Sequence, residues 1–365
     1  MHVVICGGGA IGACTTCFLA RRGIDVTVVE RTGVASSASG KAGGFLALDW
    51  CAGSPLDALA RRSFALHARL QEEIGSWSYQ RVSAYSGMVM PQGDKPRRGA
   101  PKLNWLSDGV IIGAQLSTTE TTAVIHPRAF TLGMMRAAEQ DGARLHHGEV
   151  TGLVRQGDAV GGVEVGGETL LADAVVIALG PWSVRAAQWL RLPLVFGLQS
   201  PSLVYDTGKD VPAEALFLDC QQDDGSAIGV EVFPRADGST HIAALSSRDP
   251  LPTDPADVMP DPDGLKITQL ICERLSAAFR PERIIARQAC FRPVTQDGLP
   301  LIGRVPGSER AYVATGHSVW GILNAPATGE AMAELIADGS ARTVDVTPFD
   351  PARLPAADPA SNRFG

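Results

Sequence analysis

Three glycines near the start of the chain have the spacing of a phosphate-binding turn. Gly7, Gly9 and Gly12 follow a strand-like apolar stretch, 2–6, and open a helical stretch that leads to a second strand ending at Glu30. In such a turn the glycines allow a tight bend, close approach of a pyrophosphate, and packing of helix on strand. The helix N-terminus offers free amide groups to the phosphates, and Glu30 would accept hydrogen bonds from a ribose. We therefore predict a dinucleotide site; a purely structural glycine turn is the alternative.

A second glycine-rich stretch follows this first unit. Residues 36–44, Ser-Ser-Ala-Ser-Gly-Lys-Ala-Gly-Gly, have small side chains except for Lys41. Such a loop lets the backbone lie against an extended cofactor. Glu30 does not distinguish NAD from FAD. However, an NAD dehydrogenase usually continues as a regular series of βαβ units, and here the series is interrupted at once.

The elements that must position these turns follow from the hydrophobic pattern. Buried parallel strands are expected at 2–6, 26–29 and 174–179, and a meander of short strands at 143–171. A separate antiparallel sheet is expected over 194–247, with strands near 203–205, 227–233 and 240–245. Further strands are expected at 284–291 and 311–314. The predicted helices are 10–22, 54–70, 128–140, 265–279 and 319–337. The pattern predicts an α/β fold with an additional antiparallel sheet.

Four blocks of sequence, in order, resemble the family of FAD-dependent amino-acid and amine oxidases that includes glycine oxidase, D-amino-acid oxidase and monomeric sarcosine oxidase. The blocks are Gly7 to Glu30, Ser39 to Phe45, Val175 to Ser183, and a last one, the most specific, formed by Cys290 to Gly303 with Ala314 to Gly329. The resemblance covers nearly the whole chain and looks closest to the glycine-oxidase-like branch.

The resemblance implies a Rossmann-type FAD-binding domain with an interleaved antiparallel-sheet substrate domain that roofs the flavin. The FAD-binding domain would comprise residues 1–80, 115–190 and 295–345, and the substrate domain residues 81–114 and 191–294. The residues expected to bind FAD lie in the glycine-rich turns and beside them: Gly7, Gly9, Ile11, Gly12, Glu30, Arg31, Ser39, Gly40, Lys41, Ala42, Gly43, Gly44, Val150, Gly180, Trp182, Gly316, His317, Gly321 and Ile322.

A glycine-rich turn between the last strand and the last helix provides a second helix N-terminus. Gly316-His317 and Gly321-Ile322 would aim this helix at the pyrimidine edge of the flavin, where negative charge appears on reduction. His317 could share that work. A hydrogen-bonded structural histidine is the alternative, and the sequence leaves both open.

Two charged residues are expected in the substrate pocket. Arg292 follows a strand and precedes Pro293, and an arginine at this point of the motif in the resembling oxidases grips the substrate carboxylate with two parallel hydrogen bonds. A surface ion pair is the alternative. Glu231 stands where glycine oxidase has a tyrosine, so a carboxylate there could hold a substrate amine or a second basic group. A structural or rim position for Glu231 remains open, and Ser246 is a lesser pocket candidate.

Cys290 raises the question of how the flavin is attached. Sarcosine oxidases carry a covalent flavin on a cysteine at a comparable place, but Cys290 also fits a small buried hydrophobic residue. We expect non-covalent FAD. Cys14-x-x-Cys17 lies inside the first helix, which argues against a redox-active thiol pair.

Composition narrows the class of partner. The chain has 365 residues, with 32 Lys and Arg against 39 Asp and Glu and no basic run of five or more, which makes nucleic acid an unlikely partner. Seven dispersed cysteines indicate reduced thiols, and His126, His146 and His147 lack companions at metal spacing, so we predict no metal. We expect no membrane span and, because no cleavable apolar segment precedes the first strand, a cytoplasmic protein.

We therefore expect an FAD-dependent oxidoreductase that acts on a CH-NH or CH-NH2 group. It would oxidise an amino acid or N-substituted amino acid to the imine, and oxygen would reoxidise the flavin and give hydrogen peroxide. Two alternatives are a dehydrogenase that uses another acceptor and a catalytically silent flavin-binding protein that acts by interaction.

Overall fold

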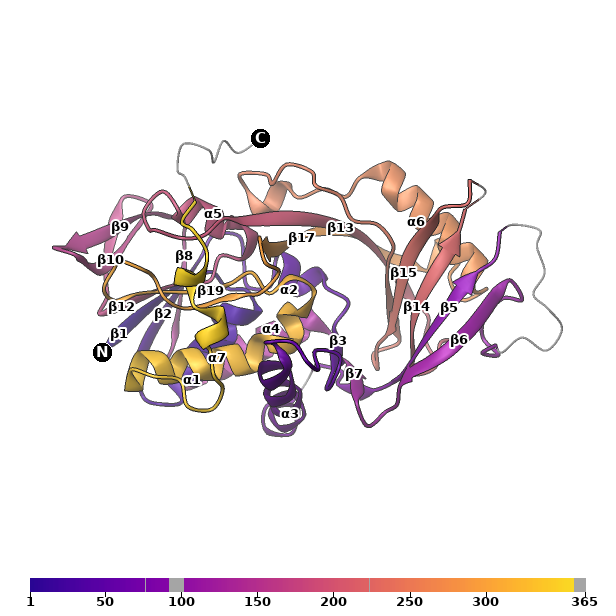
Figure 1. Ribbon diagram of the computed structural model, residues 1–365, viewed down its shortest axis with the longest axis horizontal. Helices are drawn as coiled ribbons and strands as arrows, with labels where there is room; N and C mark the ends of the chain where they lie inside the picture. Colours follow the sequence, from indigo (N-terminus) through magenta and orange to yellow (C-terminus); the bar gives the residue numbers. More distant parts are fainter. Residues whose placement is uncertain (76, 92–101, 223, 358–365) are drawn as a thin grey trace.

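The computed structural model describes residues 1–75, 77–91, 102–222 and 224–357. Residues 92–101 of the predicted substrate domain lie outside this part. Two large sheets occupy the two ends of an elongated molecule, and two long strands, β13 (Val195–Asp206) and β17 (Ile284–Thr295), run from one end toward the other (Figure 1). The cavity described below lies between the sheets.

The first sheet has six strands in the order β18-β19-β12-β1-β2-β8. All neighbours pair in parallel except β18, which is antiparallel to β19. The central strand β1 is apolar on both faces, and its Val3 to Cys6 segment is fully buried, as in a sheet covered on both sides. The bounds are β1 His2–Cys6, β2 Asp25–Glu30, β8 Arg144–His147, β12 Ala174–Ile177, β18 Leu301–Arg304 and β19 Ala311–Thr315.

Helices cover one face of this sheet and a small meander covers the other. Helix α1 packs against α4 and α7, and α3 packs against α7. A side chain at Gly329 in α7 would overlap the backbone of Cys14 in α1, so the two helices approach closely there. The helices are α1 Ala10–Ala20, α3 Asp57–Glu73, α4 Pro127–Gln140 and α7 Gly321–Asp338; the meander is β9 Val150–Gln156, β10 Ala159–Val165 and β11 Glu168–Leu171.

The meander prediction for 143–171 was wrong at its first strand. Residues 144–147 form β8, which pairs in parallel with β2 at the edge of the six-stranded sheet. Only β9, β10 and β11 form the antiparallel meander. The short apolar run of β8 could not reveal its partner, because 117 residues separate the paired residues Thr27 and Arg144 in the sequence, and local periodicity carries no such information.

The second sheet has seven strands in the order β17-β13-β16-β15-β14-β5-β6. Its pairs are antiparallel except β14 with β5, which is parallel, and β14 itself was missing from the sequence expectation. Alternate side chains such as Leu203, Tyr205 and Val232 are buried beneath helix α6, which leaves the other face to the cavity. The remaining bounds are β5 Ser83–Val89, β6 Val110–Ser117, β14 Glu214–Gln221, β15 Ala227–Pro234, β16 Ser239–Ala243 and α6 Pro262–Leu275.

A three-stranded antiparallel sheet, β3 (Phe45–Ala47), β7 (Thr122–Val124) and β4 (Gln80–Arg81), completes the architecture. The short helices α2 (Ala38–Lys41) and α5 (Ser183–Ala186) lie in the turns at the carboxyl ends of parallel strands. The predicted α/β class, with a parallel sheet and a mainly antiparallel one, is confirmed. In the described part of the chain, no helix has the length and apolar character needed to cross a bilayer.

Candidate functional site

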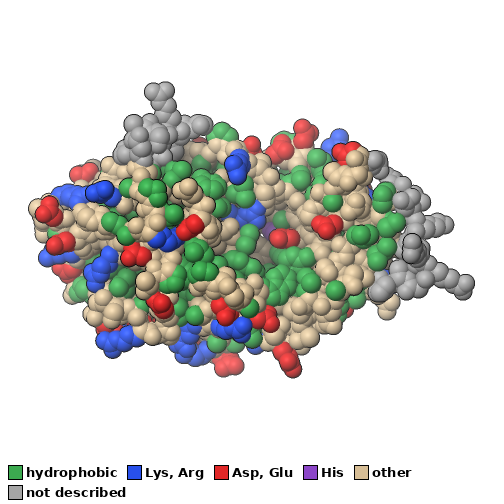
Figure 2. Space-filling view, in the orientation of Figure 1, with side chains coloured by type: hydrophobic (Ala, Val, Ile, Leu, Met, Phe, Trp, Pro, Cys, Tyr) green, Lys and Arg blue, Asp and Glu red, His purple; other side chains and the backbone are tan. Residues whose placement is uncertain are grey.

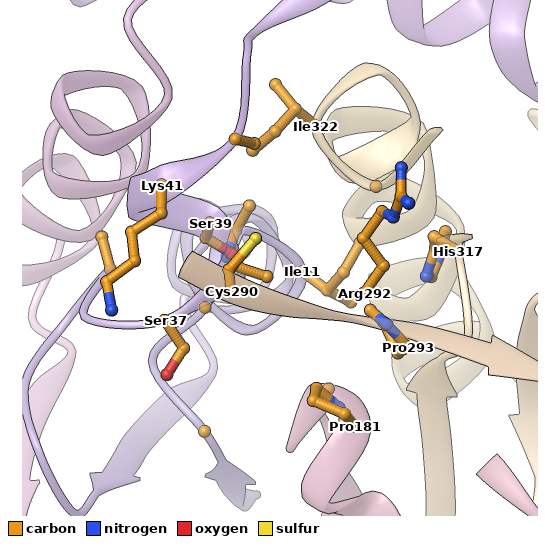
Figure 3. A pocket seen from close by; sticks show the side chains of 18 of the residues that line it. Ile11, Ser37, Ser39, Lys41, Pro181, Cys290, Arg292, Pro293, His317 and Ile322 are labelled. Carbon is orange, nitrogen blue, oxygen red and sulfur yellow. The ribbon is translucent and has the colours of Figure 1, made fainter. Parts of the chain in front are cut away.

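A cavity of about 420 Å³ runs from the turn after β1 to the exposed face of the seven-stranded sheet. Figure 2 shows a hollow near the middle of one face of the molecule. Strand β17 crosses the cavity with Cys290 and Arg292 on it (Figure 3), and His317 also lines the cavity. Elements from the whole length of the chain therefore meet at one place.

At one end of the cavity is the predicted dinucleotide turn. Gly7 has φ +113°, and a Cβ there would lie 2.5 Å from the carbonyl oxygen of Ala178, so only glycine fits. A Cβ at Gly12 would lie 2.0 Å from the carbonyl oxygen of Gly7, which explains the close contact of α1 with β1. The first amide groups of α1 thus face the cavity from a rigid turn.

The carboxylate of Glu30 is held by backbone amides at the end of β2. Its Oε2 accepts a hydrogen bond from Gly8 N at 2.7 Å, and its Oε1 accepts from Thr32 N at 2.8 Å and Gly33 N at 3.0 Å. These bonds fix the carboxylate at the cavity wall. Both lone pairs of Oε1 are thus in use, and Oε2 has one left to accept a further bond.

Arg31 belongs to an ion-pair network at the same end. It lies 3.0 Å from Glu149 and 2.7 Å from Asp254, while Arg185 lies 3.2 Å from Glu149. Arg185 and Glu149 also line the cavity and were not predicted. The network joins β2, the β8–β9 connection and the loop after β16 across this end of the cavity.

Hydrogen bonds from the seven-stranded sheet hold the small-residue loop, residues 36–44, in place. Gln288 donates to the carbonyl oxygen of Lys41 at 3.1 Å, and the buried Arg235 donates to that of Ala42 at 2.9 Å. At the other side of the loop, Ser39 Oγ accepts from Ala10 N at 2.8 Å. The loop therefore connects the first turn of α1 to the sheet that closes the cavity.

The sheet register explains which side chains of this sheet face the cavity. Phe217, Glu231, Ala243 and Ser202 are successive pairing partners across four strands, and all four line the cavity. On β17, Cys290 and Arg292 lie two residues apart and so point to the same face. On these strands, the side chains that face the cavity therefore come mainly from every second residue.

Arg292 has unused hydrogen-bonding capacity in the cavity. Its Nη2 donates to Ser246 Oγ, and its buried Nε has no partner in the described part of the chain. Burial raises the pKa of Glu231, and the positive charge of Arg292 opposes that effect. The two side chains form no ion pair within 4.0 Å in the described structure, although both line the cavity.

His317 is buried at the start of the last helical region. Its Nε2 is hydrogen-bonded to Thr328 Oγ1 at 3.0 Å, and its Nδ1 has no partner among the described residues. Burial lowers the pKa of His317 to about 3, so the ring is neutral at neutral pH. His317 is therefore a hydrogen-bonded core histidine, and it also lines the cavity.

The N-terminal turn of α7 faces the cavity at Gly321 and Ile322. Pro326 lies inside this helix and cannot donate to the carbonyl oxygen of Ile322. His67 of α3 replaces that donor: its Nε2 lies 2.9 Å from Ile322 O and 3.1 Å from Leu323 O. A histidine from another helix therefore supports the turn beside the cavity.

Four aromatic rings form the end of the cavity away from the dinucleotide turn. The ring centroids of Phe45 and Phe217 are 5.1 Å apart, those of Trp50 and Phe217 4.9 Å, and those of Phe217 and Phe233 5.5 Å. All four residues line the cavity. Sequence analysis did not predict this aromatic cluster, because its members come from the strands β3, β14 and β15 and from the turn after β3.

Most of the predicted site residues line the cavity, together with Cys290. They are Gly7, Gly9, Ile11, Glu30, Arg31, Ser39, Lys41, Ala42, Gly43, Gly44, Val150, Gly180, Trp182, Glu231, Arg292, His317, Gly321 and Ile322. Gly12, Gly40 and Gly316 lie behind the wall, where a Cβ would overlap Gly7, Ala35 and Thr295 respectively. Ser246 lies in an adjoining pocket. Across the described residues, no group of three or more His, Cys, Asp or Glu is placed to hold a metal.

Comparison with known proteins agrees with this architecture. The sequence profile of the DAO family of FAD-dependent oxidoreductases matches residues 2–335. The glycine oxidase of Pseudomonas aeruginosa is 28% identical over 373 residues, which cover 96% of this chain and 98% of that protein. The crystal structure of glycine oxidase from Geobacillus kaustophilus aligns with a TM-score of 0.79 at 24% identity, covering 96% and 98% of the two chains. That of L-proline dehydrogenase from P. horikoshii aligns with a TM-score of 0.78 at 21% identity, covering 96% and 97%.

The chain belongs to the DAO family of FAD-dependent oxidoreductases, which act on CH-NH and CH-NH2 groups. The cavity fits the cofactor that this family uses. Its glycine turn excludes side chains where a pyrophosphate must approach, and Glu30 presents a carboxylate beside it. Further along, His317 and Arg292 present buried nitrogen atoms without partners in the described structure. Membership of this family also implies that the substrates are small molecules.

Proposed function

We propose that the protein oxidises an amino acid or N-substituted amino acid to its imine, with oxygen as the final electron acceptor. The observation that supports this most directly is Arg292, whose unpartnered Nε lies in the wall of a cavity that continues to the dinucleotide turn. A guanidinium in this position fits a substrate carboxylate, because it donates two parallel hydrogen bonds in one plane.

Different parts of the chain would hold different parts of FAD. Gly7, Gly9 and the first turn of α1 would hold the pyrophosphate, and Glu30 would accept from the ribose. The first turn of α7 would place its positive end near the flavin ring. FAD, when bound, supplies the two-electron acceptor for the hydrogen removed from the substrate carbon. The imine then leaves and is hydrolysed in water.

Arg292 would orient the substrate by fixing its carboxylate at the roof of the cavity. Ser246 holds one end of the guanidinium through its hydroxyl group and so limits its rotation. The aromatic cluster of Phe45, Trp50, Phe217 and Phe233 would exclude water from the far end of the cavity. Positioning and exclusion of water are the contributions that such a wall makes to the rate.

Reduction of the bound flavin tests the proposal. The purified protein is mixed anaerobically with D-, L- and N-methyl amino acids, and the flavin absorption is followed. Bleaching with at least one amino acid, followed by peroxide release when air is admitted, is the expected result. Bleaching with an artificial dye as the only competent acceptor would replace the oxidase by a dehydrogenase. No bleaching with any amine would favour a silent flavin-binding protein.

Replacement of Arg292 tests the carboxylate site. Arg292→Ala should raise KM for the amino-acid substrate by a factor that corresponds to about 2–5 kcal/mol, because a buried charge-assisted pair is lost. The FAD content should not change. Arg292→Lys, which keeps the charge but not the planar pair of donors, should recover only part of the loss. A normal KM for Arg292→Ala would remove the carboxylate site from the proposal.

A further inference from the structure

The far end of the cavity combines a carboxylate with aromatic rings. Glu231 on β15 pairs directly with Phe217 on β14, and Phe233 lies two residues further along β15 on the same face. All three side chains line the cavity. Within the described part of the chain, Glu231 makes no hydrogen bond and no ion pair with another residue. The charge of Arg292 compensates this carboxylate only in part, and no ion pair joins the two side chains in the described structure.

A second pocket adjoins the cavity at this point. Its volume is about 390 Å³, and it shares Phe217, Glu231 and Arg292 with the main cavity. Asp219, which is exposed, and Ser246 also line it. A ligand in the main cavity therefore has room to extend past Glu231 toward a second carboxylate.

The chemistry of this end favours a cation. Burial raises the pKa of Glu231, which means that the wall disfavours its negative charge unless a positive group is supplied. The faces of aromatic rings carry partial negative charge and attract alkylammonium groups. The ring of Phe233 is stacked on Phe45 and on His241, so its faces are covered. The ring of Phe217 lies beside the carboxylate, so one cation can be stabilised by Glu231 and by this ring at once.

The distance to Arg292 limits what this cation can be. Through Ala243 and Ser202, Glu231 on β15 is in register with Gln288 on β17, and Arg292 lies four residues beyond Gln288. The backbones of Glu231 and Arg292 are therefore three strand spacings apart, about 14 Å, and are also offset along the strands. The two side chains extend over part of this separation, because the guanidinium of Arg292 reaches Ser246. We therefore assign the position beside Glu231 to a group that is bonded further from the substrate carboxylate than the α-amine is.

We propose that Glu231 and Phe217 form a subsite for an alkylammonium group that the substrate carries several bonds away from the carboxylate held by Arg292. The substrate class is then a basic amino acid, with two cationic nitrogens, and not a small neutral one. This inference rests on the proposed function, which assigns the substrate carboxylate to Arg292.

Binding of a matched pair of ligands tests the subsite without turnover. The FAD-loaded protein is titrated calorimetrically, under anaerobic conditions, with 6-aminohexanoate and with hexanoate. These ligands share the carboxylate and the chain and differ by the terminal ammonium group. We expect 6-aminohexanoate to bind at least tenfold more tightly, and Glu231→Gln to abolish most of that difference while leaving hexanoate binding unchanged. Equal binding of the two ligands to the wild-type protein would overturn the subsite.

Two further variants separate the subsite from general charge effects. Phe217→Leu should weaken binding of 6-aminohexanoate several-fold because it removes an aromatic face but keeps an apolar side chain. Asp219→Asn, at the exposed rim, should change it by less than twofold. If Asp219→Asn instead lowers the affinity as much as Glu231→Gln does, the cation binds at the rim and the proposed subsite is wrong.

Turnover then relates the subsite to the reaction. The ratio of kcat/KM for lysine to that for norleucine, measured for both enantiomers, should be at least ten in the wild type and close to one in Glu231→Gln. A ratio near one in the wild type would reject the basic substrate class and leave the oxidase proposal standing. If no amino acid reduces the flavin but 6-aminohexanoate still binds more tightly than hexanoate, the proposed function fails and the cation subsite remains.

Discussion

At the scale of single residues, the space beside Gly9 decides whether a cofactor can approach the first turn of α1. A Cβ at Gly9 would lie only 3.1 Å from Ser39 Oγ, the atom that accepts a hydrogen bond from Ala10 N. The branched side chain of valine would fill the region between this turn and the small-residue loop. Backbone amides at a helix N-terminus bind phosphate only if the phosphate can reach them.

We therefore expect Gly9→Val to abolish FAD binding. The wild-type protein should be yellow after purification, and the variant should lack the flavin absorption bands. Gly109→Val is a suitable control because no atom lies within 4 Å of a Cβ built there. A Gly9→Val protein with a full complement of FAD would show that the nucleotide lies elsewhere.

Cys290 determines whether the flavin is bound covalently. Its thiol lies in the cavity wall, and burial raises its pKa, while Arg292 and Lys41 oppose that effect. A protonated thiol is a weak nucleophile. We expect heat or acid to release the flavin into the supernatant, and Cys290→Ser to retain the wild-type flavin content. Flavin fluorescence that migrates with the polypeptide on a denaturing gel would contradict this prediction.

Some site residues could be predicted from the sequence because they belong to motifs with a fixed local geometry. The turn at Gly7 and Gly9 and the carboxylate of Glu30 are of this kind, and all three line the cavity. Trp50 and Phe217 could not be found in this way, because they meet only through the packing of β14 against a turn that is distant in sequence. Phe233 could have been predicted, because it lies two residues after Glu231 and therefore on the same face of the strand.

At the scale of elements, α7 depends on α3 for its first turn. Pro326 removes one backbone donor from the helix, and His67 supplies a side-chain donor to Ile322 O and Leu323 O in its place. Ser63, also on α3, accepts a hydrogen bond from Ala327 N at 3.1 Å. Two residues of one helix thus satisfy the backbone groups that a proline disturbs in another.

We expect His67→Leu to lower the free energy of unfolding by about 1–3 kcal/mol, because it leaves buried carbonyl groups without a donor. Because Ile322 lines the cavity, FAD affinity should fall as well. Unfolding in urea and a flavin titration measure the two effects. His67→Gln, whose amide can donate, should recover part of both. Equal stability of His67→Leu and the wild type would show that the carbonyl groups need no donor from α3.

The elements themselves were predicted unevenly, and the reason is physical. Amphipathic helices such as α4 and α6 were found near their observed bounds. Strand β14 was missed, and β8 was assigned to the wrong sheet, since a short apolar run does not specify its partner. The division into domains at the stated boundaries stays a prediction.

At the scale of the whole molecule, the two sheets and the helices between them bury several imidazole rings. His67, His241 and His317 are at most 3% exposed, and they come from α3, β16 and the turn before α7. Burial is the main reason why the pKa of His67 is lowered to about 4 and that of His317 to about 3. For His241, also lowered to about 3, the charge of Arg235 adds to the effect.

This pattern predicts a loss of stability in mild acid. In the unfolded chain each ring takes up a proton near pH 6.5, whereas in the folded protein it stays neutral until about pH 4 or 3. The unfolded state therefore binds more protons between these values, and the free energy of unfolding falls as the pH falls from about 7 to about 3. Each ring contributes a slope of up to about 1.4 kcal/mol per pH unit.

Urea unfolding at a series of pH values measures this slope, and a pair of variants assigns it. His67→Gln cannot take up a proton at this position. The slope of the free energy of unfolding between pH 6 and pH 4.5 should therefore be smaller than in the wild type by nearly the amount that corresponds to one proton, about 1.4 kcal/mol per pH unit. His147→Gln, at an exposed position of β8, serves as the control and should leave the slope unchanged. An unchanged slope in His67→Gln would mean that His67 has the same proton affinity in both states, and burial would not be what keeps this ring neutral.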